Sequence, residues 1–287
     1  MGIAVITGSS TGIGEATAVT LARAGHTVYA TMRNPATGGK ALREIAEKEK
    51  LKVRYAALDV DSDESVRETF AKILAEAGAI DVLVNNAGIG RGGPIEEAPL
   101  SDFRAVMETN YFGVIRCVQA VLGSMRERRS GCIVNVASIA GRISMAAHAP
   151  YACTKFAVEA LSEALAQEVK GFGVRVAIVE PGVIATPIFE KKQPPPETTH
   201  YPHARRLAEM FRASLETPVS PYVVGEKIGE IVDSGTWQLR HPVGPDAAGL
   251  LAWRASLSDE GWVDWGAMTD EEWVKRMRET FGLNVSL

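Results

Sequence analysis

Short apolar runs alternate along the chain with longer segments whose apolar positions recur every three or four residues. The runs are rich in Val, Ile, Leu and Ala, which predicts strands buried on both faces of a sheet, and the periodic segments predict helices. The expected strands are residues 3–7, 27–32, 52–58, 79–84, 131–137, 174–180 and 237–242. The expected helices are residues 14–24, 40–50, 63–77, 101–128, 151–172 and 222–234. This alternation predicts an α/β fold with a single doubly wound parallel sheet and helices on both faces.

Two regions interrupt the alternation. Residues 187–221 form a long insertion that contains the run Pro194-Pro195-Pro196, and residues 204–215 within it have the spacing of an amphipathic helix. The tail after Pro245 contains Trp253, Trp262, Trp265 and Trp273. Disordered tails are poor in aromatic residues, so this tail should pack against an apolar surface. Thr269 followed by Glu272 predicts a capping box that opens a final helix.

Composition and charge narrow the range of functions. The 287 residues are enough for a full core, and a net charge of -4 without a basic run argues against a nucleic-acid partner. No stretch is long and apolar enough to span a bilayer, and the N-terminus lacks the basic region of a signal peptide. The cysteines Cys117, Cys132 and Cys153 are odd in number and unclustered, which argues against disulfides and a metal site. We therefore expect a cytoplasmic protein with no metal.

The segment Thr7-Gly8-Ser9-Ser10-Thr11-Gly12-Ile13-Gly14 follows the first expected strand and precedes the first expected helix. Gly8 permits a tight turn, Gly12 lets the backbone approach a pyrophosphate, and Gly14 lets the helix pack close to the strand. The pyrophosphate would lie on the N–H groups at the positive end of the helix. The segment predicts a Rossmann-type dinucleotide site, and the alternative interpretation is a plain structural turn.

Tyr151 and Lys155 are four residues apart, so they share one face of the expected helix. A tyrosine has an ordinary pKa of about 10. A lysine ammonium at about 4 Å and an effective dielectric of about 20 supplies on the order of 4 kcal/mol, enough to lower that pKa by about three units. The pair predicts an acid/base catalyst; the alternative is an exposed surface pair. Ser138 follows a strand at the edge where ligands bind and could hold a carbonyl oxygen.

The end of the second expected strand indicates which nicotinamide cofactor would bind. NAD-dependent enzymes usually place a carboxylate there for the ribose 2′-OH, but Met32 occupies this position. Arg33 follows it, and a guanidinium suits a 2′-phosphate. We therefore expect NADP(H) in preference to NAD; the alternative for Arg33 is an exposed residue that only solvates the loop. Lys40 is a weaker second candidate.

Taken together, these motifs resemble the short-chain dehydrogenase/reductase family. The residues that carry the resemblance are the glycine turn, Asp59, Asn85-Asn86-Ala87-Gly88, Asn110, Ser138, Tyr151, Lys155 and Pro181-Gly182. They occur in the family's order over residues 3–245. The segment 29–33, together with Tyr151-x-x-x-Lys155-Phe156-Ala157, is similar to 17β-hydroxysteroid and retinol dehydrogenases, which act on bulky apolar alcohols and ketones.

The resemblance implies a role for each matching residue. Tyr151 would be the general acid or base, Lys155 would lower its pKa and bind the nicotinamide ribose, Ser138 would hold the substrate oxygen, and Asn110 would anchor a water in a proton relay. The implied cofactor-binding residues are Gly8, Ser10, Gly12, Ile13, Gly14, Arg33, Asp59, Val60, Asn86, Ala87, Gly88, Tyr151, Lys155, Pro181, Gly182, Ile184 and Thr186. An apolar pocket is suggested by Met145, Ala146, Ala147, Ile188 and Phe189, and His148 is interpreted as an ordinary loop residue.

The resulting hypothesis is an NADP-dependent oxidoreductase that interconverts a secondary alcohol and a ketone of steroid-, retinoid- or aryl-like character. The alternatives are a non-catalytic NADP-binding redox sensor and an enzyme that uses the fold for another reaction, such as elimination. We expect a catalytic unit over residues 1–245 with a substrate lid at 187–221, and an extension at 246–287 packed on that unit or on a partner subunit. The two longest helices should pair in a homodimer or homotetramer.

Overall fold

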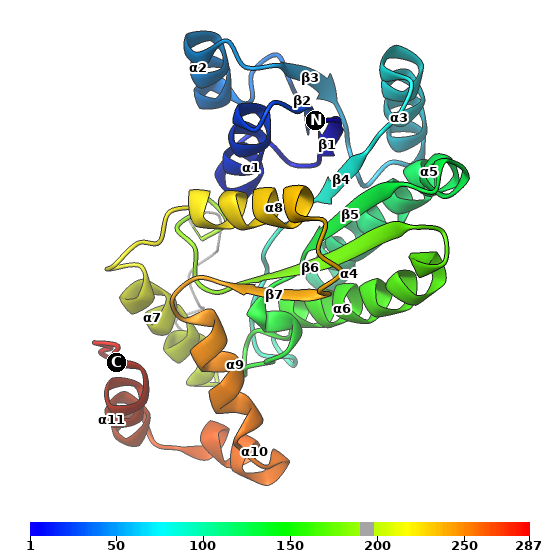
Figure 1. The fold of residues 1–287 in the computed structure, drawn as a ribbon. Coiled ribbons are helices and arrows are strands. Elements are labelled where there is room, and N and C mark those ends of the chain that lie inside the picture. The colour runs from blue at the N-terminus through cyan, green and yellow to red at the C-terminus, as the bar shows by residue number, and fades with distance from the viewer. Residues whose placement is uncertain (190–197) are drawn as a thin grey trace.

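The computed structural model describes residues 1–189 and 198–287, so the predicted run Pro194-Pro195-Pro196 lies outside the described residues. Seven parallel strands form one sheet in the order β3-β2-β1-β4-β5-β6-β7 (Figure 1). The strands are β1 (Ile3–Ile6), β2 (Thr27–Met32), β3 (Val53–Ala57), β4 (Val82–Asn85), β5 (Gly131–Val136), β6 (Val174–Pro181) and β7 (Arg240–Val243). The strand order reverses between β1 and β4, which is where a doubly wound sheet forms its ligand crevice.

Helices cover both faces of the sheet. They are α1 (Gly12–Arg23), α2 (Lys40–Glu49), α3 (Asp63–Ala77), α4 (Leu100–Met107), α5 (Gly113–Arg128), α6 (Ala149–Lys170), α7 (His203–Ser214), α8 (Tyr222–Ser234), α9 (Ala247–Ala255), α10 (Asp259–Ala267) and α11 (Asp270–Phe281). Two short helical turns, η1 (Glu108–Phe112) and η2 (Ile139–Gly141), complete the elements in the described residues. The predicted fold class is therefore confirmed.

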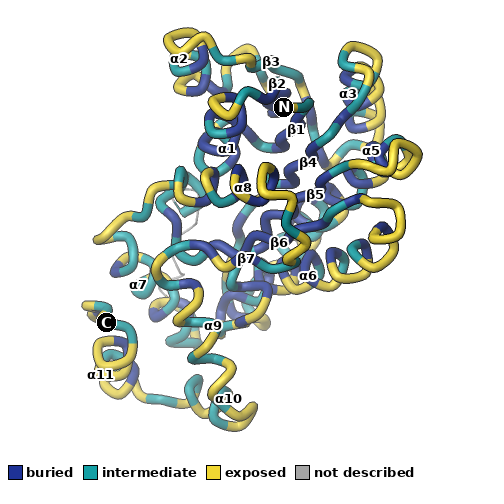
Figure 2. Tube along the Cα trace, in the orientation of Figure 1, coloured by how far each residue is buried: buried dark blue, intermediate teal, exposed yellow. Residues whose placement is uncertain are grey.

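The core divides into two layers because successive strand residues point to opposite faces of the sheet. Ala4 and Ile6 of β1 join the apolar cluster beneath α1, α2 and α8, whereas Val5 joins the cluster beneath α3, α5 and α6. Figure 2 shows the central strands buried and the outer turns of the helices exposed. A sheet buried on both faces explains why its strands read as continuous apolar runs.

One predicted helix differs from the structure. The segment 101–128 was expected to be a single helix, but α4 and α5 are separated by the single π-helical turn η1, which contains Asn110. The apolar spacing continues through this segment, so the sequence pattern hides the wider turn. π-turns of this kind often lie at functional sites.

The described parts of the insertion and the tail meet each other beyond the carboxyl edge of the sheet. Helix α7 follows β6, and α9 to α11 follow β7, so both segments leave the sheet at its carboxyl edge (Figure 1). Trp273 and Met277 of α11 pack with Ala213 of α7 in a separate apolar cluster. The predicted capping box is present, since the Thr269 side chain accepts from the Glu272 N–H and the Glu272 side chain accepts from the Thr269 N–H.

The cysteines are unpaired: Cys117 and Cys132 are buried and Cys153 is exposed. Within residues 1–189 and 198–287, no three His, Cys, Asp or Glu side chains are grouped so that they could hold a metal ion. No helix in this part of the chain has the length and apolarity needed to cross a membrane. The cytoplasmic location stays a prediction.

Candidate active site

A cavity of about 1340 Å³ opens at the carboxyl end of the sheet. Loops after β1 to β6 contribute to its walls, as expected for the crevice of a doubly wound sheet. The predicted site residues that line it are Gly8, Ser10, Gly12, Ile13, Arg33, Asp59, Val60, Asn86, Ala87, Gly88, Ser138, Tyr151, Lys155, Pro181, Gly182, Ile184 and Thr186. Gly14 and Asn110 are not part of this lining. Gly14 packs against Gly8 and Asn86, and Asn110 bonds to Ile89.

The turn between β1 and α1 requires glycine at particular positions. Gly8 and Gly12 have φ angles of +68° and +63°, which side chains rarely tolerate. A Cβ on Gly8 would lie 2.8 Å from the Cα of Ala87, and one on Gly14 would lie 2.4 Å from the Gly8 carbonyl oxygen. Thr11 at the N-cap of α1 makes no side-chain cap bond with the described residues. The turn and the N-terminal N–H groups of α1 thus form a cradle that fits a pyrophosphate.

The loop after β4 is fastened to this cradle. The Thr7 hydroxyl accepts hydrogen bonds from the backbone N–H groups of Asn86 and Ala87, each at 3.0 Å. The Asn86 side-chain amide in turn donates to the carbonyl groups of Thr7 at 2.9 Å and Gly8 at 3.1 Å. These bonds cross the strand-order reversal between β1 and β4, so they fix the floor of the crevice.

The adenosine end of the cradle is marked by the loops after β2 and β3. Arg33 is exposed and lines the cavity, while Met32 beside it is buried. Asp59 accepts a hydrogen bond from the Asp61 N–H at 3.2 Å and also lines the cavity. A cation without a carboxylate at the end of β2 fits a ribose that carries a 2′-phosphate.

Ser138, Tyr151 and Lys155 come together at the other end of the cavity. Ser138 caps η2, and its hydroxyl donates to the Pro181 carbonyl at 3.3 Å. Tyr151 lies in the first turn of α6, and Lys155 lies one turn later on the same face. The Lys155 ammonium donates to the Val136 carbonyl at 2.8 Å and lies 5.5 Å from the centre of the Tyr151 ring.

The electrostatics differ from the expectation that Lys155 lowers the pKa of Tyr151. Burial raises the pKa of Tyr151 to about 12, and the Ser138 hydroxyl acts in the opposite direction. Burial lowers the pKa of Lys155 to about 8, while the negative charge of Glu159 raises it. The Lys155 ammonium donates to the Val136 carbonyl, and desolvation is the largest influence on the pKa of Tyr151. Tyr151 is therefore protonated at neutral pH.

Asn110 fixes the loop after β4. Its side-chain oxygen accepts from the Ile89 N–H at 2.8 Å, and its amide donates to the Ile89 carbonyl at 2.9 Å and to Thr154 at 3.1 Å. The π-turn η1 thereby connects this loop to α6, the helix that carries Tyr151 and Lys155. The expected role of Asn110 in a water relay stays a prediction.

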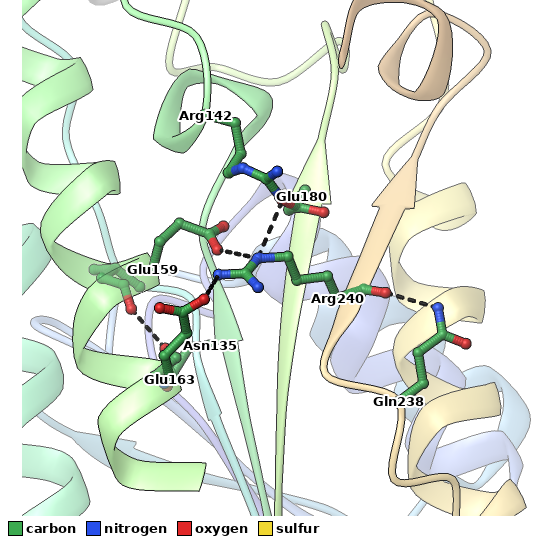
Figure 3. Close-up of polar contacts among 9 residues, drawn as sticks. Asn135, Arg142, Glu159, Glu163, Glu180, Gln238 and Arg240 are labelled. Atoms are coloured by element: carbon green, nitrogen blue, oxygen red, sulfur yellow. Dashed lines mark hydrogen bonds and ion pairs between the residues drawn. The ribbon is translucent and has the colours of Figure 1, made fainter. Parts of the chain in front are cut away.

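A charged network around Arg240 was not predicted from the sequence (Figure 3). The Nε of Arg240 lies 2.8 Å from the Oε2 of Glu159 and 3.9 Å from the Oε1 of Glu180, and its Nη2 lies 2.6 Å from the Oε1 of Glu163. Arg142 also approaches Glu180, at 3.3 Å. Glu159 and Glu180 are buried. Burial raises the pKa of Glu159 to about 7; the charge of Glu180 acts in the same direction, and Arg240 opposes it.

Compared with the wild type, Glu159→Gln should be more stable at high pH than it is at low pH. The folded-state pKa of Glu159, about 7, lies above the ordinary value of about 4.3, so the native state loses stability as the pH rises between these values. Glutamine removes that loss and can still bond to Arg240. We expect the Tm difference between variant and wild type to be about 2–6 °C more favourable at pH 8 than at pH 5.

Glu163→Gln is the matched control for this pH dependence. Glu163 contacts the same guanidinium, but its side chain is exposed. We expect its effect on Tm to be nearly constant with pH. If the two variants give parallel curves of Tm against pH, then Glu159 does not hold an extra proton in the native state.

An aromatic contact next to Tyr151 was also missed. His148, interpreted from the sequence as an ordinary loop residue, is buried and stacks on Tyr151 with ring centres 5.2 Å apart. The Phe211 ring of α7 packs edge-on against His148 at 5.6 Å. Ala147 before it has a φ of +61°, which is unusual for a residue with a side chain. His148 thus connects α7 to Tyr151. In the sequence, the only indication of this contact is that His148 precedes Tyr151 by three residues.

The tail is tied to the loop after β6 by a residue absent from the predicted site. The Asp246 carboxylate accepts from the Val183 N–H at 2.9 Å, and a Cβ on Gly182 would lie 2.0 Å from its Oδ1. The segment Pro181-Gly182 therefore needs glycine because the first residue of the extension packs against it. The sequence could not have predicted this contact, because Asp246 is 63 residues from its partner Val183 and a carboxylate just before a helix is common.

Comparison with known proteins agrees with this geometry. A sequence profile described as short chain dehydrogenase matches residues 2–197. The 3-ketodihydrosphingosine reductase of Bacteroides thetaiotaomicron is 43% identical over 180 residues, which span only 63% of this chain and 63% of that protein. Retinol dehydrogenase 8 of Homo sapiens is 40% identical over 252 residues, which cover 82% of this chain and 79% of that protein.

Solved structures extend the similarity to nearly the whole chain. A short-chain dehydrogenase from Streptomyces avermitilis is 34% identical with a TM-score of 0.80, covering 97% of this chain and 98% of its own. An alcohol dehydrogenase from Thermococcus sibiricus, complexed with 5-hydroxy-NADP, is 28% identical with a TM-score of 0.70, covering 84% of this chain and 95% of its own. The sequence profile, the relatives and the shared fold show that the chain belongs to the short-chain dehydrogenase family of oxidoreductases.

Proposed function

We propose that this protein is an NADP(H)-dependent oxidoreductase that interconverts a secondary alcohol and a ketone of apolar character. One observation carries the proposal: a continuous cavity joins the glycine cradle and Arg33 to Ser138, Tyr151 and Lys155, and continues into an apolar chamber. NADP(H), when bound in the cradle, supplies or accepts the hydride. The 5-hydroxy-NADP in complex with the Thermococcus sibiricus alcohol dehydrogenase supports this choice of cofactor.

The side chains at the inner end of the cavity would handle the proton. Because Tyr151 is protonated at neutral pH, its hydroxyl would donate a proton to the oxygen of a ketone as that oxygen becomes an alkoxide. Ser138 would orient the same oxygen by a hydrogen bond. Lys155, held by the Val136 carbonyl, would place a positive charge beside the developing anion and bind the nicotinamide ribose.

The outer chamber is apolar and aromatic. Its walls come from the loop before α6, the loop after β6, α7 and the tail, and they include Met145, Phe189, Met210, Phe211, Trp253 and Trp265. We infer that α7 and the tail together close the substrate site and exclude water. The relatives named retinol dehydrogenase and 3-ketodihydrosphingosine reductase support a bulky apolar substrate.

A cofactor-oxidation assay tests the proposed function. A panel of small, aryl, retinoid-like and steroid-like ketones would be measured with NADPH and with NADH. We expect turnover of bulky apolar ketones with NADPH. A protein that binds NADPH but turns over no ketone and oxidises no alcohol would favour the alternative, a redox sensor.

Arg33 should select NADP(H). We expect Arg33→Ala, or Met32→Asp, to raise the KM for NADPH about 10- to 100-fold and to leave the KM for NADH much less affected, since a charged hydrogen bond is worth about 1.5–3 kcal/mol. Lys40→Ala is the comparison, because Lys40 is exposed and is not part of the cavity lining. A wild-type protein that prefers NADH would overturn this assignment.

We keep the prediction that the chain forms a homodimer or homotetramer through the helices that include α5 and α6. The apolar residues Val114, Val118, Val121, Val158 and Leu165 on these helices are buried in the chain's own core. Phe112 and Phe156 remain exposed on these helices and are better candidates. Light scattering at micromolar concentration should give a mass of at least two chains, and a monomeric mass would contradict the proposal.

A further inference from the structure

Arg206 is a buried charge in the wall of the chamber. It lies on α7, is 5% exposed and lines the same cavity as Tyr151. Its Nε donates to the Asp270 carboxylate at 2.8 Å, and its Nη2 donates to the Met268 carbonyl at 2.8 Å. Its Nη1 is buried and has no hydrogen-bond partner among residues 1–189 and 198–287.

Among the described residues, this arrangement leaves two N–H groups of the Arg206 guanidinium without an acceptor. A guanidinium carries five N–H donors and no acceptor, and an unsatisfied buried charged donor costs more than a neutral one. Arg205 also approaches Asp270, at 3.6 Å, so two cations share one carboxylate. One carboxylate therefore faces two cations, beside a chamber whose walls are mainly apolar and aromatic.

Arg206 lies away from the acid/base group in the same cavity. Arg206 is five residues, or roughly 7 Å along the helix axis, from Phe211. Phe211 contacts His148, and His148 stacks on Tyr151. Arg206 and Tyr151 therefore lie at different places along the wall of one cavity, connected through α7 and His148. An elongated apolar molecule would reach both.

We propose that Arg206 binds an oxygen acceptor, carried by the substrate at the end remote from its reacting carbon. The substrate class is then a long apolar ketone or secondary alcohol with a distal carboxylate or carbonyl oxygen. This inference rests on the proposed function, because it deepens the description of the same site. Trp265 and Trp273 of the tail line the chamber near this end and would contact the apolar body.

The experiment compares ketones that share one long apolar skeleton and end in a carboxylate, a methyl ester or a methyl group. In the wild type we expect kcat/KM to be about 10- to 100-fold higher for the acid and the ester than for the hydrocarbon ketone. Arg206→Met should remove this advantage and leave kcat/KM of the hydrocarbon ketone within about threefold, and Arg206→Lys should restore part of it. Arg205→Met is the matched control, because Arg205 is exposed and shares the Asp270 carboxylate.

A purely structural Arg206, which only ties α7 to the tail, predicts a different pattern: Arg206→Met would lower Tm and reduce kcat/KM equally for all three ketones. That result, or equal kcat/KM values in the wild type, would overturn the proposal. If Arg206→Met does not fold, the comparison of the three ketones in the wild type and in Arg206→Lys still distinguishes the two roles of Arg206.

Binding in the absence of turnover separates this inference from the proposed function. Long-chain carboxylic acids without a ketone would be titrated into the ligand-free protein, followed by tryptophan fluorescence and calorimetry. We expect these acids to bind about tenfold more tightly than the matching alkanols, in the wild type and in Arg205→Met but not in Arg206→Met. No preference for the acid in the wild type would overturn the inference even if every ketone is reduced.

Discussion

Tyr151→Phe should lower kcat/KM for every ketone by at least about a hundredfold and should leave cofactor binding intact. The phenol hydroxyl is the only group removed, and a positioned general acid contributes about 10²- to 10⁴-fold to the rate. The Phe ring can keep the stacking on His148, so the helix start and the chamber should remain in place. Activity would be measured with NADPH and a bulky ketone, and cofactor affinity by NADPH fluorescence.

Tyr201→Phe is the matched control for this substitution. The Tyr201 hydroxyl bonds to Glu96, and that contact is exposed. We expect this variant to keep wild-type kcat/KM within about threefold. Near wild-type activity of Tyr151→Phe would contradict the assignment of Tyr151 as the acid, whereas loss of both activity and NADPH binding would point to a disrupted site.

The parts of the site that could be predicted depend on chain order. The turn Gly8 to Gly14 follows a strand and opens a helix, and Ser138 follows the strand β5, so the sheet topology alone places both at one edge. Tyr151 and Lys155 are fixed relative to each other by one helical turn. The spacing of Tyr151 and Lys155 is local in sequence. The shared edge of the turn and Ser138 follows from the parallel sheet, which the apolar runs already predict.

The parts that could not be predicted depend on pairs distant in sequence. Arg240 meets Glu159 across 81 residues, and nothing in the pattern of either segment points to the other. The raised pKa of Tyr151 has a similar origin, because it comes from burial, which depends on how distant segments pack around the ring. The apolar spacing of residues 101–128 shows a different limit: it predicts a helix, but it does not show that the chain's own core covers the valines of α5.

Removing residues 258–287 should raise the KM for bulky apolar ketones about 10- to 100-fold and leave small ketones nearly unaffected. This truncation deletes α10 and α11 and keeps Asp246, whose carboxylate holds the Val183 N–H. It removes Trp265 and Trp273 from the chamber wall, and burial of a large apolar side chain contributes about 1.5–3 kcal/mol. The small ketones would still meet Ser138 and Tyr151, which lie on the retained part of the chain.

Point variants keep this prediction testable if the truncated protein does not fold, since α7 would lose its apolar partners Trp273 and Met277. Trp265→Ala removes one wall residue that packs on Trp253 with ring centres 4.8 Å apart. Trp237→Ala is its control, because Trp237 is exposed and packs under Lys170, away from the chamber lining. We expect Trp265→Ala to raise the KM of bulky ketones about tenfold, and Trp237→Ala to leave it unchanged. If the truncated protein and Trp265→Ala both keep their KM for bulky ketones, the tail only covers α7 and has no part in the substrate site.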